Sequence, residues 1–307
     1  MNKTKLYIIG NGFDLYHEIR SGYGDFKAFL THEDNRLFEL VRDYIPVNED
    51  NNKANGDWSN LEAALGEVDI DYMVDNNSVF LPSYASDDWS DSGHHDFQYE
   101  IGRIVDDLST TLRSQFAKWV RIIEIPDALN ARKLLSTLDK EGLYLSFNYT
   151  STLASLYSVP MTNTLHIHGV AGMRDSEIVL GHAWNPNNRK SLNDHPRIKE
   201  QDVRVTEAYD ILDEYFSKTF KPSAKIIQDN NSFSTSLRNI KEIVVLGHSL
   251  SDVDRSYFEA VVKAINITSV RWTIACRDNK EVQDKSERVM GFGVPFHLIN
   301  MVLWDTL

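Results

Sequence analysis

Cysteine and long apolar runs are the two things that this sequence most clearly lacks. Cys276 is its single cysteine, which excludes an internal disulfide and any zinc site built from several cysteines. No apolar stretch approaches the roughly 20 residues that cross a bilayer, so a membrane role is not expected. Residues 1–5 lead directly into a strand pattern and contain no apolar signal segment. We therefore expect a cytoplasmic protein.

Positive charge is also in short supply. The chain has 32 Lys and Arg against 45 Asp and Glu, a formal net charge of −13, and no basic run. Because nonspecific binding to nucleic acid depends on Lys and Arg that neutralise phosphates, this composition argues against a duplex-DNA partner. The 42% hydrophobic and 25% charged content is that of an ordinary globular protein, and 307 residues suffice for one large α/β domain.

Strand and helix patterns alternate along the chain. Strand patterns, mostly continuous apolar runs as in strands buried on both faces, occur at 5–10, 142–147, 163–168, 177–181, 241–247, 269–276 and 297–303. Apolar spacing of about 3.6 residues predicts helices over 25–44, 58–68, 97–123, 126–140 and 204–222. This order predicts an α/β fold: a Rossmann-like parallel sheet in a single domain over 1–307, with a large helical insertion or cap at 25–140.

Four short polar segments each follow a predicted strand. They are residues 10–14 (GNGFD), 147–150 (FNYT), 166–169 (HIHG) and 247–250 (GHSL). Ligands of open α/β sheets bind outside the carboxyl ends of the strands, so we expect the four segments to converge there and form a nucleotide site. Gly181 and His182 follow a fifth predicted strand and precede Trp184, which suits either a stacking lid over a base or a packed loop.

The first segment places Gly10 and Gly12 in a strand-to-helix turn, with Asn11 between them. Such glycines let the backbone approach a phosphate or a ribose. The full GxGxxG pattern is absent because residue 15 is Leu, and the carboxylate of Asp14 suits a sugar hydroxyl better than a phosphate. A tight turn with Asp14 as helix cap explains the same residues.

The next two segments carry an amide and two imidazoles. Asn148 either caps the following helix or orients a water or a ribose hydroxyl. His166 and His168 are two residues apart in a predicted strand, so both should project to the same face. This pair suits a general base, metal ligands or hydrogen bonds to a nucleotide, and a metal would need a third ligand such as Asp254 or His248.

The fourth segment, Gly247, His248 and Ser249, ends the most apolar strand. Its glycine and serine suit backbone and hydroxyl contacts to a ligand. A serine-hydrolase nucleophile elbow is not expected, because the glycine required two positions after Ser249 is missing. Asp252, a few residues further on, is placed to cap a helix.

A larger set of short motifs runs in a fixed order along the chain. They are residues 10–15 (GNGFDL) with His17, Tyr23 with Phe26, Trp58 with Glu62, residues 147–153 (FNYTSTL), residues 166–169, and residues 247–249 with Asp252 and Asp254. In this order they resemble the AbiH family of phage abortive-infection proteins, from residue 8 to about residue 260. The resemblance implies a role in antiphage defence.

The order of motifs is similar, more distantly, to sirtuin-like NAD-binding domains. The matching positions are Gly10 and Gly12 for the glycine turn, Asn148 for a strand-end asparagine, His168 and Gly169 for a His-Gly pair, and Gly247 and Ser249 for the last turn. Thr150 stands where an aspartate is usual. The resemblance implies NAD as ligand or substrate, since several bacterial defence members of that superfamily hydrolyse NAD.

The resemblance therefore implies an effector that hydrolyses the N-glycosidic bond of NAD or a related nucleotide, with His168 as general base and Asn148 orienting the water or the ribose. The binding residues that we predict are Gly10, Asn11, Gly12, Asp14, His166, Gly247, His248, Ser249 and Asp254, with no metal. Two alternatives stay open: a metal-dependent phosphoesterase or nuclease using His166, His168 and Asp254, and a nucleotide-sensing module without turnover. Expected partners are a nucleotide, a second copy or a defence-system protein, and an unidentified phage trigger.

Overall fold

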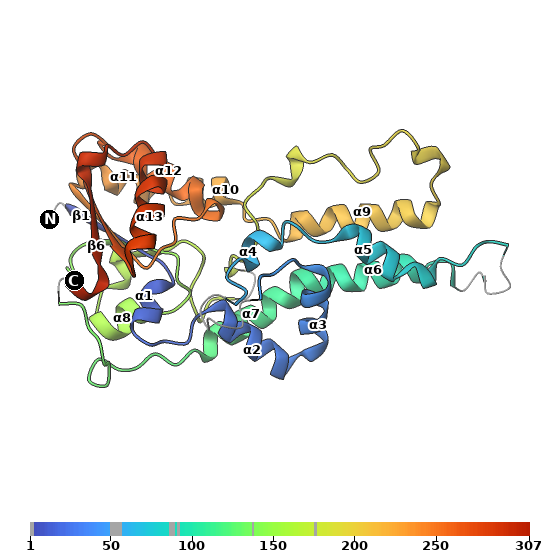
Figure 1. Cartoon of the computed structure of the whole chain (residues 1–307), viewed down its shortest axis with the longest axis horizontal. Coiled ribbons are helices and arrows are strands. Elements are labelled where there is room, and N and C mark those ends of the chain that lie inside the picture. Colours follow the sequence, from blue (N-terminus) through green and yellow to red (C-terminus); the bar gives the residue numbers. More distant parts are fainter. Residues whose placement is uncertain (1–2, 50–56, 86–89, 91–92, 137, 175–176) are drawn as a thin grey trace. The chain divides into compact units, whose positions relative to one another are not determined.

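The computed structural model describes the chain apart from residues 1–2, 50–56, 86–89, 91–92, 137 and 175–176 (Figure 1). The chain forms a six-stranded sheet in which every neighbouring pair is parallel, in the order β3-β2-β1-β4-β5-β6. The strands are β1 (Lys5–Ile9), β2 (Leu143–Ser146), β3 (Thr164–His166), β4 (Glu242–Leu246), β5 (Arg271–Cys276) and β6 (Ile299–Leu303). The order reverses between β1 and β4, as in doubly wound folds. The predicted Rossmann-like α/β sheet is confirmed.

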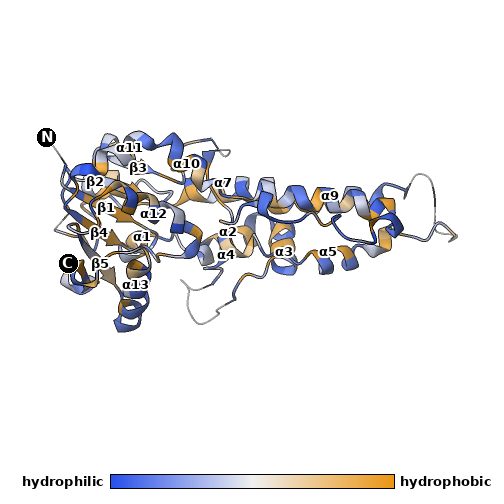
Figure 2. Ribbon diagram, turned by 90° about the horizontal axis from the view of Figure 1, so that it is seen from above, coloured by the Kyte–Doolittle hydropathy of each residue, from blue (hydrophilic) through white to orange (hydrophobic). Residues whose placement is uncertain are grey.

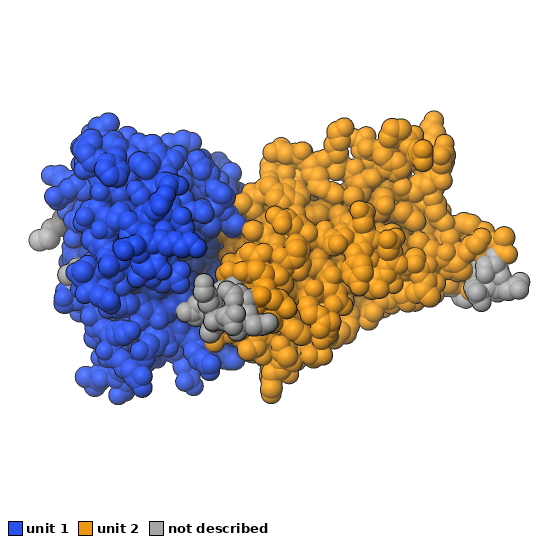
Figure 3. Space-filling view, viewed as in Figure 1, with its two compact units in different colours: residues 1–22, 117–179, 222–307 blue, residues 23–116, 180–221 orange. Residues whose placement is uncertain are grey.

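The chain divides into two compact units (Figure 3). Unit 1 comprises residues 1–22, 117–179 and 222–307 and contains the sheet, whereas unit 2 comprises residues 23–116 and 180–221 and is mainly helical. The helical unit 2 therefore has other bounds than the predicted insertion at 25–140. Residues 117–140 belong to unit 1, and residues 180–221 belong to unit 2. No described helix is both long and apolar enough to cross a membrane.

Helices flank the sheet in unit 1 and build most of unit 2. Those of unit 1 are α1 (Gly12–Tyr16), α8 (Thr152–Tyr157), α10 (Ser223–Asp229), α11 (Asn231–Ser236), α12 (Arg255–Ala264) and α13 (Asn279–Gly291). Those of unit 2 are α2 (Tyr23–Glu33), α3 (Asn35–Tyr44), α4 (Leu61–Ala64), α5 (Ile70–Asn76), α6 (Asp96–Asp106) and α9 (Val203–Lys218). A π-helical turn (Asp107–Thr111) joins α6 to α7 (Leu112–Ile122), and the boundary between the units falls within α7.

The strands of the sheet supply side chains to two apolar cores, one on each face. In β1, Leu6 and Ile8 belong to the core that includes residues of α12 and α13, while Tyr7 and Ile9 belong to the core that includes residues of α1 and α8. All four side chains are at most 2% exposed. Burial on both faces explains why the strands read as continuous apolar runs, and Figure 2 shows the hydrophobic colour along them.

One predicted strand, at 177–181, is not part of the sheet. The backbone N–H of Val179 donates to the carbonyl of His168 at 2.9 Å, and the only strand-like pairing nearby among the described residues is an isolated bridge between His182 and Phe220. Ile178 and Leu180 are buried, and this burial accounts for the apolar pattern of a segment that is not a strand. Gly181 and His182 therefore do not mark a fifth strand end, and that prediction is wrong.

Two helix predictions also differ from the structure. The predicted helix at 126–140 consists of turns and irregular backbone in its described residues. Ala131, Leu135 and Leu138 pack against the core that contains α1 and α8, so a loop reproduces the apolar spacing of a helix. The predicted helix at 25–44 is broken at Asp34, whose carboxylate accepts from the N–H of Leu37 at 3.1 Å and starts α3.

The turns that follow β1 and β4 touch each other through glycine. The N–H of Gly10 donates to the carbonyl of Leu246 at 3.0 Å, and the N–H of Gly12 donates to the carbonyl of Gly247 at 2.8 Å. A Cβ on Gly247 would lie 2.0 Å from the backbone nitrogen of Phe13, and Gly247 has a φ of +72°. Only glycine fits there, because a side chain meets both a steric clash and a strained backbone.

Gly247→Ala should lower the free energy of unfolding by at least about 2 kcal/mol, because a methyl group forces the two turns apart. Gly102→Ala is the matched control: it lies inside α6, and a Cβ there meets nothing within 4 Å. That change should stabilise the protein by roughly 0.5–1 kcal/mol through helix propensity. Urea unfolding of the three proteins measures both effects, and equal stabilities of wild type and Gly247→Ala would contradict the contact.

Candidate functional site

The chain that leaves β2 places polar groups beside both the β1 end and the β3 end of the sheet. Phe147 packs into the core with α12, whereas the amide of the next residue, Asn148, faces Asp14 on α1. Thr150 then reaches Asp14 directly. Residues from the first three strand ends are thus brought together, as the sequence predicts.

Asp14 is fully buried at this point. The hydroxyl of Thr150 donates to its Oδ2 at 2.5 Å, and the hydroxyl of Thr152 donates to that of Thr150 at 3.0 Å. Its other oxygen, Oδ1, has no hydrogen-bond partner in the described part of the chain. Burial raises the pKa of the Asp14 carboxyl to about 6, and the surrounding hydroxyls and amide limit the rise.

Asn148 is 5% exposed, and neither atom of its side-chain amide makes a well-directed hydrogen bond to a described residue, although the amide lies near enough to Asp14 to oppose the rise of that carboxyl's pKa. Its backbone is satisfied, since its N–H donates to the hydroxyl of Ser146 at 3.2 Å and its carbonyl accepts from His166. The helix-capping role is excluded, because α8 begins at Thr152 with Ser151 as its cap residue. A buried, unpaired amide costs about 1–3 kcal/mol, so it marks a place where a ligand or water supplies the partner.

His166 is held as a neutral base. Its Nδ1 lies 3.1 Å from the carbonyl of Asn148, which only accepts, so Nδ1 carries the proton and Nε2 keeps its lone pair. Burial lowers the pKa of His166, and the bond to the carbonyl opposes that change. The strand β3 ends at this residue, so the alternation that would place His168 on the same face does not extend to His168.

His168 and His248 lie on either side of the carboxylate of Asp254. Their Nε2 atoms are 3.5 Å and 3.4 Å from its two oxygens, and both rings are at most 3% exposed. The N–H of Leu250 donates to Nδ1 of His248 at 2.9 Å, so His248 presents Nε2–H to Asp254. Phe147 packs edge-on against both imidazoles. The carboxylate of Asp254 therefore lies between two buried histidines, within ion-pair distance of both.

Among the remaining predicted contacts, the glycine turn and Asn11 are engaged within the chain. The N–H groups of Gly10 and Gly12 bond to the β4 end, and the side chain of Asn11 exchanges hydrogen bonds with Ser21 at 2.9 Å and 2.6 Å. Ser249 is exposed. The structure thus explains the glycine turn by its contact with Gly247.

No group of three or more His, Cys, Asp or Glu residues among those described is arranged to hold a metal ion. His166, the third member of the alternative metal set, points its Nδ1 at a carbonyl, while His168 shares Asp254 with His248. The loop residue His182 is 1% exposed in unit 2 and bonds to the carbonyl of Phe216 at 3.0 Å, as in its packed-loop interpretation.

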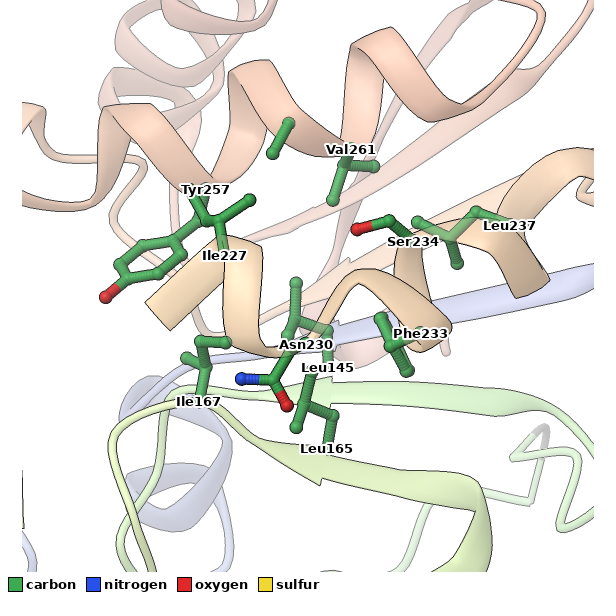
Figure 4. A pocket seen from close by; sticks show the side chains of 11 residues that line it. Leu145, Leu165, Ile167, Ile227, Asn230, Phe233, Ser234, Leu237, Tyr257 and Val261 are labelled. Atoms are coloured by element: carbon green, nitrogen blue, oxygen red, sulfur yellow. The ribbon is translucent and has the colours of Figure 1, made fainter. Parts of the chain in front are cut away.

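An apolar hollow lies beside the histidines, lined by side chains of β2, β3 and helices α10 to α12 (Figure 4). It contains about 320 Å³ of empty space, part of which is open to solvent. Ile167 and Tyr257 line it, and the Tyr257 ring also lies 5.4 Å from the ring of His168. The polar strand-end residues do not line the hollow, so it is a neighbour of the polar site.

The family model described as Bacteriophage abortive infection AbiH matches residues 6–276. The chain belongs to the AbiH family. The match begins in β1 and ends with β5, so it includes every strand-end residue described above. No curated protein and no solved structure matches the chain. Membership of the AbiH family suggests a role in abortive-infection defence against phage.

Unit 2 of this AbiH protein contains a polar cluster of Lys221, Glu62 and Tyr23, and the sequence analysis did not identify Lys221. Lys221 is 0% exposed and its ammonium contacts the carboxylate of Glu62, which also accepts from the hydroxyl of Tyr23. The three residues are brought together from the first and last residues of unit 2 and from α4. Glu62 and Tyr23 are among the short motifs identified in the sequence, but no local pattern marks Lys221 as their partner.

Glu62→Ala should lower the free energy of unfolding by about 3–5 kcal/mol, because it leaves a buried ammonium without its carboxylate. Asp229→Ala is the matched control, since Asp229 pairs with Lys225 at 2.7 Å with both side chains more than half exposed. It should cost less than about 1 kcal/mol. Chemical unfolding compares the two, and similar losses would show that Glu62 and Lys221 are not coupled as described.

Asp14 should make stability fall as pH rises from about 4 to 6. Its pKa is about 6 when folded and near 3.8 when unfolded, so the native state binds the extra proton across this window. The stabilisation is complete below the lower value and is lost above the higher one, a change of roughly 3 kcal/mol. Asp14→Asn should remove this slope in urea unfolding measured at several pH values. Asp252→Asn, at an 86% exposed side chain, should leave the slope as in wild type, and a persisting slope in Asp14→Asn would refute the assignment.

Proposed function

We propose that this AbiH protein binds a nucleotide at the ends of β1, β2 and β3 and hydrolyses its N-glycosidic bond as part of antiphage defence. NAD is the substrate that we favour. The observation that carries the proposal is the buried Asn148 amide, unpaired among the described residues and facing Asp14. It lies at the strand ends of a doubly wound sheet, where such folds bind ligands.

In this proposal His166 is the general base and Asn148 positions the attacking water or the ribose. His166 fits the role better than His168, because its proton is fixed on Nδ1 while the Nε2 of His168 faces a carboxylate. His166 would take a proton from the water as the new C1′–O bond forms. The C1′–N bond breaks at the same time, and its electron pair leaves with the nicotinamide. Asp14 would accept a hydrogen bond from a sugar hydroxyl through Oδ1.

His168, His248 and Asp254 support this site from the side. The carboxylate of Asp254 lies between the two rings, and Phe147, which precedes Asn148, packs against both. The distant resemblance of the motif order to sirtuin-like domains is what favours NAD among nucleotides. The glycines of the two turns would shape this site by holding Asp14 in place, since two of their N–H groups are used inside the chain.

His166→Gln should reduce NAD hydrolysis by about 10²–10⁴-fold, because a positioned base typically contributes that much. Asn148→Ala should also abolish most turnover, whereas His32→Gln, at a side chain 86% exposed in unit 2, should leave it unchanged. Release of nicotinamide from NAD is followed by chromatography, with and without a chelator. Turnover that survives in both His166→Gln and Asn148→Ala would reject the proposed chemistry.

Thermal unfolding of the same samples separates binding from turnover. A ligand that binds only the native state raises the melting temperature, and the rise grows with the logarithm of the ligand concentration above its Kd. Stabilisation by NAD that disappears in Asn148→Ala, with the NAD recovered intact, would favour a sensing module. Loss of activity on chelation would instead favour the phosphoester alternative.

A further inference from the structure

The last strand, β6, lies at one edge of the sheet, within a segment of the chain that has no charged side chain apart from a histidine. Residues 289–304 contain one histidine and no Asp, Glu, Lys or Arg, although a quarter of the whole chain is charged. About four charges would be expected in a segment of that length. Natural proteins usually protect an exposed edge strand with charged residues, proline or a covering segment. The strand β6 itself, Ile299–Leu303, has neither a charge nor a proline.

The outer side of β6 is open in the described structure. The sheet ends with β6, which pairs on one side with β5, and no described strand follows it. Its residues are partly buried or exposed, and Leu303 is 38% exposed. Phe296, just before the strand, is 71% exposed, and Met290 at the end of α13 is 39% exposed. Unpaired backbone groups beside exposed apolar side chains are typical of a surface that another strand covers.

We propose that a second copy of this chain covers that edge, with β6 pairing antiparallel to β6 across a two-fold axis near Met301. Pairing centred there sets Ile299 opposite Leu303 of the second copy, so apolar residues meet along the whole strand. The exposed His297 and Asp305 flank the strand at equal distance from Met301. Antiparallel pairing brings His297 of one copy near Asp305 of the other. The edge is therefore complementary to itself in apolar pattern, and each His297 imidazole offers a donor to an Asp305 carboxylate.

The charge of the whole chain also favours this edge as the meeting place. Each copy carries a formal charge of −13, so two copies repel each other wherever acidic surface meets acidic surface. An uncharged strand is the surface where that repulsion is smallest. A closed two-fold contact uses the same residues on both copies and removes the open edge from each.

Light scattering after size-exclusion chromatography tests the proposal on the full chain, and it needs no nucleotide. The wild type should have about twice the single-chain mass of 35.2 kDa. Leu303→Lys combined with Asn300→Lys places charges on two exposed positions of β6 and should give the single-chain mass. Leu129→Lys is the matched control, since Leu129 is 97% exposed elsewhere in unit 1, and it should keep the doubled mass. A wild type of single-chain mass, or a double variant that stays doubled, would overturn the proposal.

Cysteine cross-linking tests the register of the same contact. Residues directly opposite in an antiparallel pair have Cβ atoms about 4.5–5.5 Å apart, so Met301→Cys should form a disulfide between two copies under mild oxidation. The native Cys276 is buried and should not interfere, and Leu129→Cys serves as the exposed control. A covalent dimer of Met301→Cys that exceeds that of Leu129→Cys supports the register. Equal cross-linking of the two variants would contradict it, while activity toward NAD bears on the proposed function alone.

Discussion

The contact on which this structure depends is the one between the turns that follow β1 and β4. Gly12 and Gly247 meet there through their backbones, with no room for a side chain on Gly247. This contact closes the point where the strand order reverses, and it fixes the start of α1. Asp14, two residues after Gly12, is consequently buried against the chain that leaves β2. The position of the acidic group in the candidate site thus follows from the packing of two glycine turns.

Buried polar groups of the described chain differ in whether another side chain of the chain satisfies them. In unit 2, the ammonium of Lys221 is fully buried but lies against the carboxylate of Glu62. In unit 1, the amide of Asn148 and one oxygen of Asp14 are buried without hydrogen-bond partners among the described residues. Folded chains rarely leave such groups unpaired without a functional reason. Unit 2 also contains buried atoms without such a partner, Trp58 Nε1 and Gln98 Oε1 among them. What distinguishes the strand-end site is that its two groups of this kind, Asn148 and Asp14, face each other.

The sequence predicted the sheet better than the connections, because strands buried on both faces leave a continuous apolar pattern. The helix predicted at 126–140 and the strand predicted at 177–181 are loops with buried apolar side chains, so their apolar patterns resemble those of regular elements. Asn148 and Asp14 were identified because they follow strands directly. The preference for His166 over His168 needed hydrogen-bond partners, and the pairing of Lys221 with Glu62 joins residues far apart in the chain. Neither can be read from local spacing.

Under the proposed function, the electrostatics of the site suit a substrate whose reacting part is positively charged. Burial raises the pKa of Asp14 and lowers the pKa of His166, so both groups are driven toward their neutral forms. A cationic ring and a sugar centre that becomes positive as its bond breaks would stabilise the ionised form of Asp14 in this poorly solvated place. A neutral nucleoside would offer no such charge in its ground state. The nicotinamide of NAD carries a positive charge while it is bonded to ribose and loses it on leaving, so under the proposed function the buried carboxyl of Asp14 is a reason to test NAD before nucleotides with neutral bases.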